Sequence, residues 1–221
     1  MSVTLTWYLI LVPDAFDQAI SKEFELARKT AQKCELESMS VIEKWEVCPE
    51  SFGWHMLACE ISDRHIYYDT WIDINELQAF FSLFNRKEFE SLFFKYMTFC
   101  GPNSRCGVFE VAEVVVTHRD TAPAVLFQAI GNDALKELPG FFGNFYIRKD
   151  NLKKELERYN NLLVKQGRSI LYQRGTEFYN APCNNKEDNQ VVEEIVNALP
   201  KAIKYAIERK CGLLGLVVTA G

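Results

Sequence analysis

The sequence has only three histidines, His55, His65 and His118, and it lacks the short motifs of the commonest catalytic and nucleotide-binding sites. No serine-hydrolase elbow, zincin helix, Walker loop or dinucleotide fingerprint occurs in its 221 residues. Each of these motifs places a nucleophile, a metal or a phosphate in a fixed local geometry. We therefore expect no cofactor, and we favour a non-catalytic protein over an enzyme.

Long apolar runs and regularly spaced cysteines are also missing. The apolar N-terminal run stops at Pro13 and Asp14, and no basic region precedes it, so it predicts a buried strand and not a signal or a membrane span. The seven cysteines are an odd number without regular spacing. This usage favours a reducing compartment, and we expect a cytoplasmic protein with reduced thiols.

The pair Cys100 and Cys106 is the stretch that most resembles redox or metal chemistry. Five residues separate the two thiols, whereas zinc ligands usually have two to four residues between them and thioredoxin-like pairs have two. Gly101 and Pro102 are typical of the end of a helix. The spacing therefore predicts a turn and no metal site, with thiol chemistry and a metal as the less favoured alternatives.

Acidic residues outnumber basic ones, 30 against 25, so the chain carries a formal net charge of -5. This balance argues against general affinity for nucleic acid, which requires a dense basic face. The charge is uneven, however, since residues 148–174 hold eight basic side chains and three acidic ones. Most such segments are solvated helix faces; the alternative is a small-anion sensor that uses Arg148, Lys149 and the helix after them.

Apolar residues are plentiful, and they predict one α+β domain over residues 1–221, with a mainly antiparallel sheet packed against amphipathic helices. We expect most strands in the first half and most helices in the second. Gly140 and Gly143 predict a close backbone approach or a strand edge. The predicted strands are 3–11, a hairpin of 54–62 and 64–74, 106–118, 168–173 and 213–221. The predicted helices are 14–31, one or two over 73–100, one or two short ones over 125–140, 150–166, and 192–207, which Pro200 kinks or divides; 180–189 is predicted to be a loop.

The strand predicted at 64–74 carries the candidate binding residues. Alternation places five side chains on one of its sides: His65, Tyr67, Asp69, Trp71 and Asp73. Exposed tyrosine and tryptophan are suited to anchoring a partner. On a regular strand, His65 and Asp69 lie about 13 Å apart, which is too far for a hydrogen bond between them. The simpler interpretation is a solvent-facing polar side without a ligand.

These patterns favour a cytoplasmic, non-catalytic protein-binding module with an acidic docking surface. An immunity or inhibitor-type role against a basic protein partner fits the charge. The alternative is a thiol- or His/Asp-dependent hydrolase built on the same strand. No membrane or nucleic-acid partner is expected, and the sequence does not specify an oligomeric state.

Overall fold

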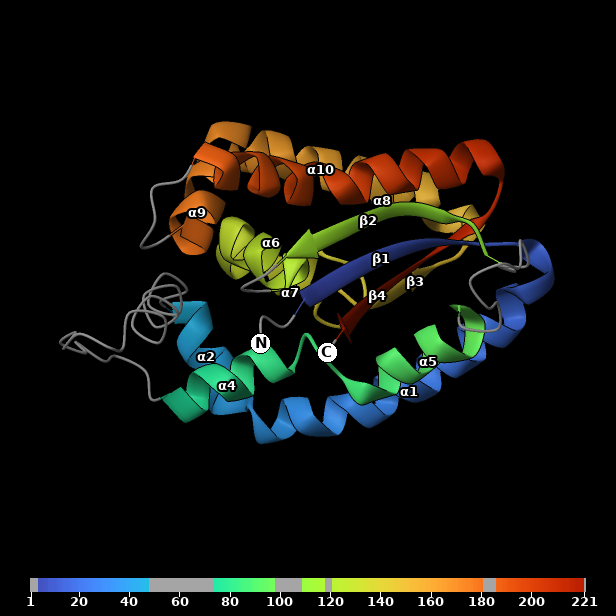
Figure 1. Ribbon diagram of the computed structural model, residues 1–221, viewed down its shortest axis with the longest axis horizontal. Helices are drawn as coiled ribbons and strands as arrows, with labels where there is room; N and C mark the ends of the chain where they lie inside the picture. The colour runs from blue at the N-terminus through green and yellow to red at the C-terminus, as the bar shows by residue number, and fades with distance from the viewer. Residues whose placement is uncertain (1–3, 48–73, 98–108, 118–120, 181–185, 221) are drawn as a thin grey trace, which may run out of the picture.

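Within the described residues, four strands form an antiparallel sheet at the centre of the molecule, in the order β2-β1-β4-β3 (Figure 1). The computed structural model describes residues 4–47, 74–97, 109–117, 121–180 and 186–220. The strand β1 (Thr4–Val12) lies between β2 (Val111–Thr117) and β4 (Gly212–Ala220). The short β3 (Phe145–Ile147) pairs with the other side of β4. The predicted α+β class with a mainly antiparallel sheet is confirmed.

Strand β1 takes the central position because it is apolar on both faces. Leu9, Ile10, Leu11 and Val12 are consecutive residues, and each is at most 2% exposed. A strand that faces water on one side would show alternation instead. The strands predicted at the two ends of the chain are β1 and β4. They pair with each other over nine residues, from Thr4 to Val12 of β1.

Helices cover both faces of the sheet. The first face is covered by α1 (Asp17–Glu37) and α5 (Lys87–Met97), and the second by α6 (Ala122–Ile130) and α10 (Lys186–Arg209), outside which α8 (Leu152–Gln166) and α9 (Arg168–Asn180) pack (Figure 1). The helices α2 (Met39–Val47) and α4 (Ile74–Ser82) lie together beyond one end of the sheet, and α7 (Ala134–Glu137) is one short turn. The predicted helical spacing in α1 is confirmed by the burial of Ile20, Phe24, Ala27 and Ala31.

The strand predicted at 168–173 is wrong, because these residues begin α9. The buried positions Leu171, Gly175 and Phe178 follow helical spacing and face the neighbouring helices. At Gly175 an added Cβ would lie 2.7 Å from a side-chain carbon of Val192, so glycine allows α9 and α10 to approach closely. A short apolar run is ambiguous between strand and helix until such contacts are known.

Pro200 neither ends nor divides the last helix, since α10 runs through it from Lys186 to Arg209. A proline has no N–H, so the carbonyl of Val196, four residues earlier, lacks its helical donor. The buried hydroxyl of Tyr159 donates to this carbonyl over 3.0 Å. The same helix corrects the predicted loop at 180–189, of which residues 186–189 are helical.

Within the described residues, strands and helices are not divided between the two halves of the chain as predicted. Helices α1, α2, α4 and α5 precede β2, and β3 and β4 belong to the second half of the chain. The 73–100 segment forms two helices, α4 and α5, and not one. The predicted hairpin at 54–74, except Ile74, and the predicted turn at Cys100 and Cys106 lie outside the described residues.

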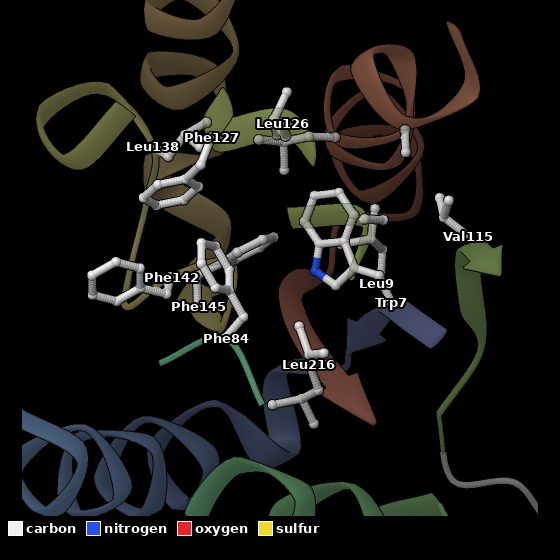
Figure 2. Close-up of a cluster of buried hydrophobic side chains, with 14 of the residues drawn as sticks. Trp7, Leu9, Phe84, Val115, Leu126, Phe127, Leu138, Phe142, Phe145 and Leu216 are labelled. Carbon is white, nitrogen blue, oxygen red and sulfur yellow. The ribbon is translucent and has the colours of Figure 1, made fainter. Parts of the chain in front are cut away.

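An aromatic cluster fills the second face of the sheet (Figure 2). The ring centroids of Phe84, Phe127 and Phe142 lie 5.0–5.3 Å from one another. The ring of Trp7 packs edge to face against that of Phe145. The turn between Phe141 and Asn144 positions this cluster through backbone hydrogen bonds in both directions. Its central residues have φ of 44° at Phe142 and 85° at Gly143. A Cβ added at Gly140 would lie 2.2 Å from the backbone oxygen of Asn144, which confirms the predicted close backbone approach at this glycine.

Candidate functional site

The residues that the sequence singles out for binding lie outside the part of the chain that the structure describes. This holds for His65, Tyr67, Asp69, Trp71 and Asp73. It also holds for Cys100, Cys106 and the two other histidines. These assignments remain predictions, and the candidate site below is built from described residues alone.

Acidic partners from other parts of the chain bind much of the basic segment 148–174. Arg148 forms an ion pair of 2.9 Å with Asp17, and Lys149 pairs with Asp14. Lys165 forms an ion pair of 2.8 Å with Asp133, and this contact holds the pKa of that carboxyl below its ordinary value. The two cations proposed for an anion sensor therefore already have carboxylate partners within the protein.

An acidic groove of about 360 Å³ lies between β2 and α10. Its carboxylates come from Glu113 on β2 and from Glu193 and Glu194 on α10, and Lys201 is the cation at its border. Lys201 donates to both carboxylate oxygens of Glu113, at 3.0 and 2.8 Å. One ammonium against three carboxylates leaves the groove negative, a charge that favours a cationic group of a ligand.

Exposed apolar side chains lie on the other face of the same edge strand. Val114 and Val116 are 43% and 46% exposed, because α5 packs mainly against β4, two strands away from β2 in the sheet. Tyr8 pairs with Val114 across the strands and stacks on Phe93 at 4.4 Å, and Phe93 contacts Phe94, which is 47% exposed. We call these five residues the β2 apolar patch. Large exposed apolar residues that adjoin one another are typical of contact surfaces.

The two described cysteines differ in their surroundings. A guanidinium nitrogen of Arg86 donates to the sulfur of Cys34 at 2.8 Å and to the carboxylate of Glu88 at 3.0 Å. Burial raises the pKa of the Cys211 thiol, and the carboxylates of Asp14 and Glu110 raise it further. Cys211 is therefore protonated near neutral pH and is a poor nucleophile.

Sequence reasoning missed the acidic groove because Glu113 is far along the chain from Glu193 and Glu194. Glu193 and Glu194 occupy the polar side of an amphipathic helix, a position that the 3.6-residue period does indicate. The period says nothing about Glu113, which reaches the groove only because α10 runs along β2 (Figure 1). The alternation of β2 could have identified its exposed valines, although not their neighbours on α5.

Two observations on the described residues and the comparisons with known proteins complete the description of the site. None of the described helices combines the length and apolar character needed to cross a membrane. Within the same residues, no group of three or more His, Cys, Asp or Glu side chains is arranged to hold a metal ion. The chain matches no protein-family model, no curated protein and no solved structure in the comparisons with known proteins.

Proposed function

We propose that this protein is a non-catalytic binding module that docks on a basic partner protein through the edge of the sheet formed by β2. The observation that carries the proposal is the joint occurrence of two features on this strand. One is the acidic groove between Glu113 and α10, and the other is the β2 apolar patch around Val114 and Val116. A partner that covers the edge would contact both.

The two features have different physical roles in such a complex. The apolar patch supplies area that binding removes from water, which contributes about 25 cal/mol for each Å² buried. The groove supplies selectivity, because a lysine or arginine of the partner would enter a cavity whose charge is negative. The net charge of -5 acts in the same direction over longer distances and accelerates encounter with a basic protein.

The proposed role is that of an immunity or inhibitor-type protein, in which an acidic surface covers a basic target. The side chains His65, Tyr67, Asp69, Trp71 and Asp73 belong to the proposal as a second contact surface. Their aromatic and acidic character matches that of the β2 edge. The two surfaces can be separated by mutation, since they lie on different segments of the chain.

The test begins with affinity capture at low and high salt and continues with the dissociation constant of each captured basic protein. The double variant E193K/E194K reverses the groove, and we expect it to weaken binding more than tenfold at low salt. The matched control is E37K/E43K, which makes the same change of net charge at two exposed glutamates of α1 and α2. Equal losses in both variants would show that only net charge matters and would refute docking at this groove.

The apolar patch has its own test. We expect V116D to weaken the same complex at high salt as well, because the loss of apolar contact is not screened by ions. Binding that tolerates V116D and the groove reversal, but is lost with W71A, would move the docking surface to the 64–74 segment.

A further inference from the structure

A second groove, of about 340 Å³, lies where α8, α9 and α10 meet. Asn160 contributes to it from α8, Arg168 from the start of α9, and Lys201, Lys204, Tyr205 and Glu208 from α10. Three cations face one carboxylate here, so the groove is positive. It adjoins the acidic groove through Asn197 and Lys201, which line both.

The cations of this groove differ in whether a carboxylate of the protein already binds them. Among the described residues, neither Arg168 nor Lys204 takes part in an ion pair, whereas Arg148, Lys149 and Lys165 all do. Lys201 shares its charge with Glu113. Arg168 and Lys204 therefore remain available to a ligand, and with the carboxylate of Glu208 the groove keeps a net charge of +1 beyond the Lys201–Glu113 pair. A guanidinium binds two oxygens of a phosphate side by side, and an ammonium adds a point charge.

The groove also offers a hydrogen-bond acceptor for the uncharged part of a ligand. Asn197 donates from its amide nitrogen to the hydroxyl of Tyr172 at 3.2 Å and to the carbonyl of Glu193 at 2.8 Å. Both amide hydrogens are thereby used, and its carbonyl oxygen remains to accept from a ligand hydroxyl.

The ring of Tyr205 forms one wall of the groove and is held from two sides. Its hydroxyl donates to Glu110 at 2.5 Å, and the guanidinium of Arg209 lies 5.1 Å from the ring centroid. Pro200 adds a rigid apolar surface next to it. The groove thus combines two cations without ion-pair partners, an acceptor for a hydroxyl and a flat wall, the kinds of polar and apolar groups that ligand sites share.

We infer that the groove between α8, α9 and α10 binds a small hydroxylated phosphate monoester, with Arg168 and Lys204 on the phosphate and Asn197 on a hydroxyl. This site differs from the sensor expected at Arg148 and Lys149, and it does not rest on the proposed docking function. A phosphate ester is favoured over a carboxylate because it spreads two negative charges over three oxygens, enough for both cations.

Calorimetric titration of the purified chain tests the assignment with three probes: inorganic phosphate, ribose 5-phosphate and ribose. We expect ribose 5-phosphate to bind about tenfold more tightly than inorganic phosphate and ribose alone not to bind, at constant ionic strength. Failure of both phosphates to bind at millimolar concentration would overturn the inference.

Matched variants connect the binding to the groove. We expect R168Q and K204Q each to weaken ribose 5-phosphate at least tenfold, while N197L removes the preference over inorganic phosphate. The control is K153Q, which removes an exposed cation of α8 that lines neither groove. Because Arg168, Lys204 and Lys153 are exposed, melting temperatures close to that of the unmodified chain verify the fold. A loss in K153Q equal to that in R168Q would indicate general charge attraction and refute the site.

Discussion

The hydroxyl of Tyr159 substitutes for the N–H that Pro200 lacks, and this relation can be measured as a coupling energy. The perturbation is Y159F, which removes one oxygen from a buried ring. The hydroxyl oxygen lies 3.0 Å from the carbonyl oxygen of Val196. If residue 200 were not proline, its backbone N–H would donate to this carbonyl. Without the hydroxyl, this carbonyl is buried without that donor.

The magnitude follows from the cost of leaving a buried acceptor unpaired, about 1–3 kcal/mol. We expect Y159F to lower the free energy of unfolding by this amount in the natural chain. In a P200A background the new N–H binds Val196, so the same ring change should cost less than about 0.5 kcal/mol. The double-mutant cycle should therefore give a coupling of about 0.5–3 kcal/mol between positions 159 and 200.

The assay is urea unfolding followed by far-ultraviolet circular dichroism for the four chains of the cycle. The variant Y172F serves as control, because the hydroxyl of Tyr172 contacts the side chain of Asn197 and not a carbonyl freed by proline. Its cost should be the same with proline or alanine at position 200. An identical cost of Y159F in both backgrounds would refute the reasoning, since the hydroxyl would then not replace the missing donor.

Three further predictions concern the 140–147 segment. N144A should lower the free energy of unfolding by about 2–5 kcal/mol in the same urea assay, because the fully buried amide of Asn144 donates to a carbonyl after α4 and accepts from a β4 N–H. G143A should lower the melting temperature more than G167A. Both glycines have positive φ, but an added Cβ would lie 2.2 Å from a proline ring at Gly143 and 3.8 Å from its nearest neighbour at Gly167. Burial raises the pKa of Tyr146 above its unfolded value of 10.0, so the folded state retains a proton that the unfolded chain releases. Stability should therefore fall as the pH rises above about 10, and less steeply in Y146F; an unchanged slope would contradict this assignment.

The sequence by itself determined the elements whose signal is local. The continuous apolar run of β1 and the helical spacing in α1 and α8 specify which atoms must leave water, whatever their partners are. Gly140 and Gly143 predicted a close backbone approach or a strand edge because they lie among phenylalanines in the sequence. In these segments propensity, hydrophobic pattern and turn chemistry favour the same structure.

The tertiary structure alone decided the features that depend on residues distant in the chain. The apolar run at 168–173 is part of α9, which packs against α6 and α10, and Pro200 stays within α10 beside the hydroxyl of Tyr159. Both grooves arise in the same way, since α10 brings its charged side chains to β2, α8 and α9. Local patterns specify which side chains leave water, whereas charge and hydrogen-bond complementarity depend on which surfaces meet, and that is a property of the whole fold.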